Sequence, residues 1–97
     1  MHNEIDLDAV QNALEDYSEY AKKRDAAIIQ YIETGNDKGM RKLIKDNGGK
    51  VPRNLDVFHA GILKSAQYCM NIPDYIKAKA FTMCLEMGFN PYMRMMD

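Results

Sequence analysis

The 97-residue chain carries 13 Lys and Arg residues against 14 Asp and Glu residues, which gives a formal net charge of −1. A chain of this length is expected to form one domain, and its composition, 46% hydrophobic and 28% charged, argues against disorder throughout. The near-neutral charge also argues against a dedicated nucleic-acid binder, because such proteins are normally basic.

The N-terminal segment is predicted to form an acidic helix over about residues 6–21. Several Asn and Asp residues near its start can cap the first turn, where the helix dipole favours acids. Residues 1–20 contain no Lys or Arg and six acids: Glu4, Asp6, Asp8, Glu15, Asp16 and Glu19. Residues 21–50 reverse this balance, with eight Lys or Arg residues against four acids.

An apolar row runs along the N-terminal segment in steps of four and three, a spacing typical of helices that pack against other helices. Its members, which Arg24 interrupts, are Val10, Leu14, Tyr17, Ala21, Ile28 and Tyr31. A second apolar row, Ile29 and Ile32, begins only after Arg24. This change of face indicates a kink or a break near residues 22–25, and it favours two helices over about 6–21 and 25–34.

The next predicted helix, about residues 38–47, follows a glycine turn at Gly35 and has two distinct faces. One face is apolar, with Met40, Leu43 and Ile44. The opposite face carries a basic stripe that consists of Lys38, Arg41, Lys42 and Lys45. Two glycines end this helix, and the loop of residues 48–54 that follows adds two more cations, Lys50 and Arg53.

Two further helices are predicted in the C-terminal half of the chain. The first starts at Asn54 or Asp56, and its apolar residues are spaced by threes and fours. The second lies between Pro73 and Pro91 and is apolar over most of its circumference, which predicts a central, buried helix with Phe81 in the core. A tail over residues 89–97 ends the chain and contains Tyr92, Met93, Met95 and Met96.

Residues 26–48 resemble the body of an ankyrin repeat, and residues 57–91 resemble it more loosely. The likeness lies in the glycine turn at Gly35, the paired aliphatic residues Leu43 and Ile44, and the glycine that follows at Gly48. This resemblance implies stacked helical hairpins over about residues 25–47 and 55–88, with the acidic helix as a cap. The alternative is an irregular bundle of four or five helices, so both interpretations make residues 1–97 a single all-α domain.

No pattern of catalytic or metal-binding residues is evident. No two of His2, His59, Cys69 and Cys84 have zinc-finger spacing, and no serine has a recognisable catalytic context. Gly48, Gly49 and Lys50 follow the end of a helix, which is the wrong polarity for phosphate. We therefore expect no enzyme, metal or cofactor. The start of the chain lacks a signal peptide, so we expect free thiols and a cytoplasmic protein without a membrane segment.

The basic stripe and the methionine-rich tail are the strongest candidates for a binding surface. Clustered cations bind acidic protein surfaces or phosphate backbones, and they can also form a solvated face or pair with the acidic helix, within the chain or across a dimer. Met93, Met95 and Met96 either fold back over the last two helices or contact another chain.

The sequence thus predicts a non-catalytic protein-interaction module, a small adaptor, regulator or inhibitor. Its partner is another protein or a second copy of the chain. Weak nucleic-acid or anion binding through the basic stripe is the alternative function.

Overall fold

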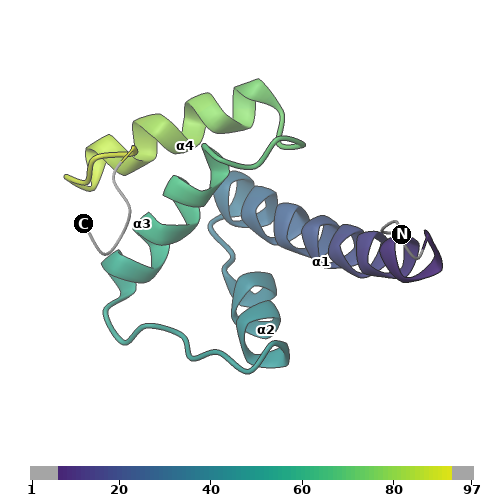
Figure 1. Ribbon diagram of the computed structural model, residues 1–97. Helices are drawn as coiled ribbons and strands as arrows, with labels where there is room; N and C mark the ends of the chain where they lie inside the picture. The colour runs from purple at the N-terminus through teal and green to yellow at the C-terminus, as the bar shows by residue number, and fades with distance from the viewer. Residues whose placement is uncertain (1–6, 93–97) are drawn as a thin grey trace.

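The chain forms four α-helices in the computed structural model, which describes the backbone of residues 7–92 and the side chains of residues 19–92. The helices are α1 (Leu7–Thr34), α2 (Lys38–Asp46), α3 (Leu55–Ala66) and α4 (Asp74–Glu86), and they form two antiparallel pairs, α1 with α2 and α3 with α4 (Figure 1). The described residues contain no β-strand. The prediction of a compact all-α fold is therefore confirmed.

Helix α1 is continuous over 28 residues, so the predicted break near residues 22–25 is wrong. Among the described side chains of this helix, one buried row consists of Ala21, Asp25, Ile28 and Ile32, in steps of four, three and four, and Ala27 and Tyr31 are buried beside it. Asp25 rather than Arg24 occupies this row, and its carboxylate accepts two hydrogen bonds of 3.2 Å from the Arg24 guanidinium. The Asp25 carboxylate is paired with Arg24, so this row continues along one face of the helix.

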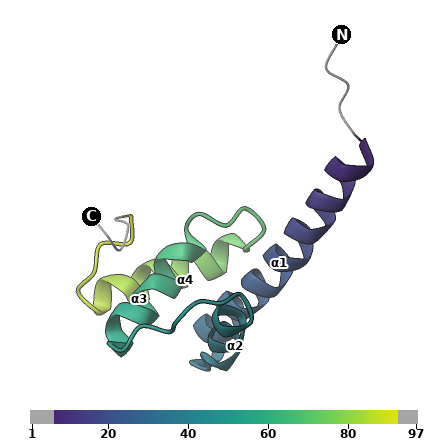
Figure 2. The ribbon, with the colours of Figure 1, turned by 60° about the horizontal axis from the view of Figure 1, so that its bottom comes forward.

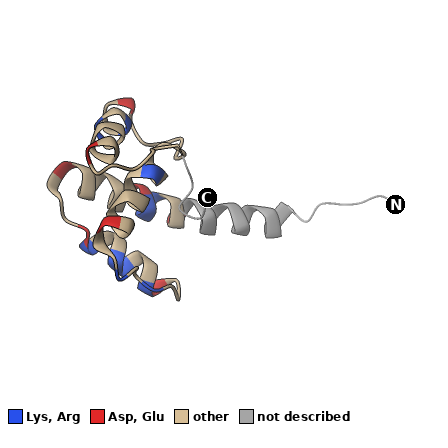
Figure 3. Cartoon of the chain, turned by 90° about the vertical axis from the view of Figure 1, so that its left-hand side faces the viewer, with Lys and Arg blue, Asp and Glu red and all other residues tan. Residues whose placement is uncertain are grey.

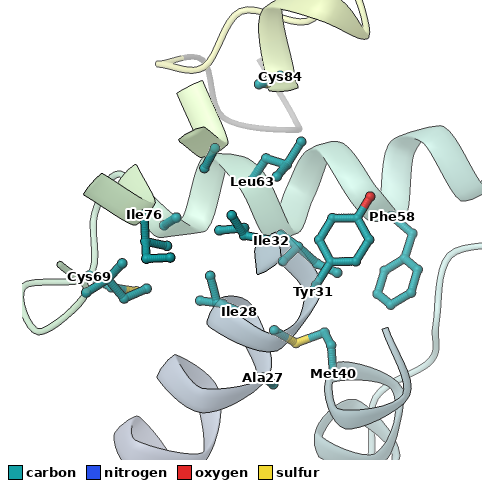
Figure 4. Packing of buried hydrophobic residues seen from close by; sticks show 14 of the residues in the cluster. Ala27, Ile28, Tyr31, Ile32, Met40, Phe58, Leu63, Cys69, Ile76 and Cys84 are labelled. Carbon is teal, nitrogen blue, oxygen red and sulfur yellow. The ribbon is translucent and has the colours of Figure 1, made fainter. Parts of the chain in front are cut away.

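The C-terminal half of α1 lies at the centre of the fold and packs against α2, α3 and α4 (Figure 4). It contributes Ala27, Ile28, Tyr31 and Ile32 to a core that the other three helices complete. The remaining fully buried core side chains include Leu63 from α3 and, from α4 and the segment before it, Ile72, Ile76 and Cys84.

Helix α4, by contrast, lies at the edge, so its prediction as the central helix is wrong. It buries Ile76, Ala80 and Cys84 on one face, while Leu85 on the opposite face is 53% exposed. Phe81 is only partly buried and makes an edge-to-face contact with Tyr92 at 5.4 Å between ring centroids. An apolar pattern around the whole helix therefore reflects one buried face and one exposed face.

Two hydrogen bonds join α3 and its C-terminal extension to α4 and the end of the described chain. The Gln67 side-chain amide donates to the backbone carbonyl of Lys77 at 2.9 Å, and the Tyr68 hydroxyl donates to the carbonyl of Tyr92 at 2.7 Å. Residues 89–92 thus pack on their own chain, whereas Met93, Met95 and Met96 lie outside the described residues. Both cysteines are buried free thiols, as the sequence predicts.

Helix α1 also gives the molecule its elongated shape. Its N-terminal half extends beyond the other three helices, and the principal dimensions are 55 × 27 × 26 Å (Figures 1 and 2). Within the part of the chain that the structure describes, no helix combines the length and the hydropathy needed to cross a bilayer.

Candidate protein-interaction surface

The basic stripe lies on the outward face of α2, as its spacing predicts. Met40 and Leu43 are buried on the inner side of this short helix, whereas Lys38, Lys42 and Lys45 are exposed on the outer side. The positions of Lys and Arg along the described chain are blue in Figure 3. Lys50 and Arg53 are exposed in the loop that follows. Five of the six predicted cations therefore belong to one accessible region around α2.

Arg41 is the exception, because its side chain is partly buried and paired with Asp37. Its Nε donates to Asp37 Oδ1 at 2.9 Å and its Nη2 to Asp37 Oδ2 at 3.2 Å. The guanidinium carbon also lies 5.1 Å from the centre of the Phe58 ring, within the range of a cation–π contact. Arg41 therefore connects α2 to α3, and its role as a freely accessible binding residue is not supported by this geometry.

The Asp37 carboxylate is the centre of a polar junction between α1, α2 and α3. Besides Arg41, it contacts His59 Nε2 at 2.8 Å, and the His59 ring stacks on Tyr31 with centroids 4.7 Å apart. The hydrogen bonds from Arg41 and then His59 lower the pKa of Asp37, so the carboxylate is ionised. We call Tyr31, Asp37, Arg41, Phe58 and His59 the polar junction.

Local sequence explains why Asp37 is free to form this junction. Asp37 precedes α2, but the side chain that caps the helix is that of Asn36, whose Oδ1 accepts a 2.9 Å hydrogen bond from the backbone N–H of Lys38. The Asp37–Arg41 spacing of four residues was a visible signal of this ion pair. No local pattern indicated the contact with His59.

The other cations around α2 differ in how far they are neutralised. Lys42 Nζ lies 2.8 Å from Asp46 Oδ2 in an exposed pair one helical turn apart, and this bond raises the pKa of Lys42. Among the described residues, no ion pair involves Lys38, Lys45, Lys50 or Arg53. These four form the available positive charge of the surface.

An apolar groove of about 430 Å³ runs between α2 and α3, and one of these cations, Lys50, belongs to its lining. The backbones of the two helices do not approach each other closely, and the loop before α3 contributes Gly49, Lys50 and Pro52 to the lining. Met40 and Phe58 are buried at its floor, and Ile44 and Val57 are partly exposed on its sides. The full lining consists of Met40, Ile44, Gly49, Lys50, Pro52, Val57, Phe58, Gly61, Ile62 and Ser65.

A second groove, about 550 Å³, lies on the other side of α2, against α1. Its walls combine small residues such as Ala26 and Gly39 with the charged side chains of Lys23, Lys42 and Asp46. It offers fewer large apolar side chains than the groove between α2 and α3. The latter groove, with its neighbouring cations, is therefore the better candidate for binding a protein.

The described histidine and both cysteines have identifiable surroundings. The described residues contain no group of three or more His, Cys, Asp and Glu side chains arranged to hold a metal ion. Burial raises the pKa of both Cys69 and Cys84, which keeps these thiols protonated and poorly nucleophilic. His59 is occupied by Asp37 and Tyr31, in agreement with its interpretation as a satisfied histidine.

The fold and this surface define a small four-helix domain with an apolar groove beside a basic helix face. In comparisons with known proteins, no family model, curated protein or solved structure matches the chain.

Proposed function

We propose that the protein is a non-catalytic interaction module that binds, in the α2–α3 groove, a protein segment carrying both apolar and acidic side chains. The observation that carries this proposal is the presence of an unpaired cation in an apolar groove. Lys50 lines the groove and has no ion pair among the described residues, and the exposed Lys45 follows the groove residue Ile44 on α2. An apolar site beside positive charge selects a segment in which apolar and acidic side chains alternate.

An amphipathic helix is the form of partner that suits this groove best. In helix-in-groove recognition, apolar side chains spaced by three and four residues fill the groove while polar residues remain at its edges. Each Å² of apolar surface that the partner buries contributes about 25 cal/mol, and complementary charge mainly accelerates association and sets specificity. A role as an adaptor, regulator or inhibitor follows from binding of this kind.

The proposal extends to the ankyrin-like arrangement and to the compartment. The glycine turn at Gly35, where φ is 76°, and the pairing of α1 with α2 and of α3 with α4 support an ankyrin-like pair of hairpins. The absence of direct packing between α2 and α3 favours the irregular bundle. Two buried free thiols support a reducing compartment such as the cytoplasm.

A titration with designed peptides, followed by NMR of the isotopically labelled full chain, tests the proposed function. We expect an amphipathic helical peptide with leucine on one face and glutamate elsewhere to shift the resonances of Ile44, Val57 and Gly61. The same peptide with lysine in place of glutamate should shift them much less. Absence of any groove shift with the acidic peptide would contradict the proposal.

Two matched variants locate the response. Val57→Asp places a negative charge on the apolar side of the groove and should abolish binding of the acidic peptide. Leu85→Asp introduces the same charge at an exposed apolar position on α4 and should leave binding unchanged. A short RNA duplex provides the competing outcome. If it shifts Lys38 and Lys45 at physiological salt while the acidic peptide has no effect, the function is nucleic-acid binding instead.

A further inference from the structure

We infer that the segment bound in the α2–α3 groove is the acidic N-terminal part of α1 from a second copy of the chain, exchanged reciprocally in a two-fold dimer. This inference rests on the proposed function, because it names the partner of the same groove. It goes further by making the chain both the receptor and the ligand.

The first argument is the position of the segment. The N-terminal half of α1 extends beyond α2, α3 and α4 instead of lying along them (Figure 2). Among the side chains described before Ala27, only Ala21 and Asp25 are buried. At 1.5 Å per residue, residues 7–20 extend about 20 Å along the helix axis. This length is sufficient to reach into a groove on a neighbouring molecule.

The second argument is charge. Residues 1–20 carry six acids and no Lys or Arg. Lys50 lines the groove, Lys38 and Lys45 are exposed on α2 and Arg53 is exposed in the following loop, and none of the four has an ion pair among the described residues. Two copies of the acidic segment would repel each other if they paired side by side, because every charge on both is negative. Binding next to the cations of α2 replaces this repulsion with attraction.

The third argument is the apolar row of the segment. Val10, Leu14 and Tyr17 follow one another in steps of four and three, which is the spacing of anchor residues in helix-in-groove recognition. The groove presents Ile44, Val57 and Ile62 to such anchors. The segment therefore has the alternation of apolar and acidic residues that the groove selects.

Symmetry determines the form of the assembly. A segment of one copy that binds a different surface of the next produces an open chain unless the exchange is reciprocal. When each protomer donates its segment to the other, both grooves are filled and growth stops. We therefore expect a dimer with two equivalent contacts.

The experiment is a charge exchange between two full-length variants, with mass measured by light scattering after size exclusion. One variant carries Lys45→Glu and Lys50→Glu beside the groove, and the other carries Glu15→Lys and Asp16→Lys in the segment. Like charges across an interface are strongly unfavourable, so we expect each variant alone to dimerise at least ~100-fold more weakly than the wild type. An equimolar mixture of the two should form a heterodimer, because opposite charges face each other again.

Controls separate this result from misfolding and from general charge effects. Circular dichroism should show wild-type helicity for the groove variant, because Lys45 and Lys50 are exposed. Lys79→Glu, an exposed substitution on α4, should leave the dimer intact, whereas Lys50→Glu should weaken it.

Failure of this inference and failure of the proposed function give different results. A wild-type chain that remains monomeric up to about 100 μM, where a weak specific complex would already form, overturns the inference. So does a mixture of variants that does not associate. If designed acidic peptides still shift the groove residues in that case, the proposed function stands and the partner is another protein. If they do not, both are wrong.

Discussion

The junction of α2 with its neighbours and the junction of α3 with α4 are built from different interactions. At the first, the Asp37 carboxylate lies 2.8–3.2 Å from the nitrogen atoms of Arg41 and His59. The Tyr31 ring stacks on His59, and the Arg41 guanidinium lies over the Phe58 ring. At the second, apolar side chains such as Leu63, Ile76 and Cys84 are almost fully buried. Charged contacts between α2 and α3 replace the close packing that these helices lack, and they leave a groove where packing would have closed it.

The largest effect is expected in the apolar region. Leu63→Ala removes a side chain with no exposed surface, so we expect the free energy of unfolding to fall by about 3 kcal/mol. Urea denaturation followed by circular dichroism measures this change. Leu85→Ala is the matched control on α4, and it should cost no more than about 0.5 kcal/mol because Leu85 is 53% exposed. Equal losses for both would show that the core is misplaced.

A smaller loss is expected in the polar junction. Asp37→Asn keeps the size of the side chain but removes the charge that Arg41 and His59 bind, so we expect a loss of about 2 kcal/mol at neutral pH. Asp46→Asn breaks only an exposed pair and should cost less than about 0.5 kcal/mol. A wild-type denaturation midpoint for Asp37→Asn would remove the distinction between the two regions.

The same variant should also change the response to pH. The pKa of Asp37 is lower in the folded chain than in the unfolded chain, so its contribution to stability is complete above the ordinary carboxyl pKa near 4. That contribution is lost as the pH falls through the lower, folded value. When the pH is lowered below about 4, the free energy of unfolding of the wild type should therefore fall more than that of Asp37→Asn. Parallel pH profiles for the two proteins would contradict this.

Phe81 should respond more weakly than a core residue. Its ring is partly buried and its main aromatic contact is the edge of Tyr92, so Phe81→Ala should cost about 1–2 kcal/mol. Thermal or urea denaturation measures the loss. A cost comparable with that of Leu63→Ala would restore α4 as a central helix.

The smallest effect on stability is expected at Lys45. Lys45→Glu changes an exposed side chain without an ion pair in the described part of the chain, and the free energy of unfolding should change by no more than about 0.5 kcal/mol. Arg41→Glu, by comparison, places two carboxylates together in the polar junction and should destabilise the fold clearly. A marked loss of stability in Lys45→Glu would show that this cation, too, is structural.

Local patterns predicted much of the secondary structure. The glycines at 35 and 48 end α1 and α2, and Asn54 caps α3 by accepting hydrogen bonds from the backbone N–H groups of Asp56 and Val57. These features depend on neighbouring residues, so the sequence displays them directly. The break in α1 was predicted wrongly because a charged Arg24 in an apolar row gives no sign that Asp25 takes its place.

Tertiary relationships were harder to predict for a physical reason. Helical periodicity shows which face of α4 is apolar, but it does not show which face finds a partner, and Leu85 is exposed as a result. For the candidate surface, the spacing of the lysines predicted the exposed face of α2. The groove and the contact of Arg41 with Phe58 depend on α3, which is distant in sequence, so neither was visible.

The contact between Asp37 and His59 also has a consequence for folding kinetics. Only three residues separate α1 from α2, whereas Asp37 and His59 lie 22 positions apart, so their hydrogen bond requires closure of a longer loop. Closing that loop costs entropy before the bond can form, which places it late in folding. Interactions that form after the transition state slow unfolding more than they accelerate folding. The hydrogen bond between Asp37 and His59 should therefore slow unfolding more than it accelerates folding.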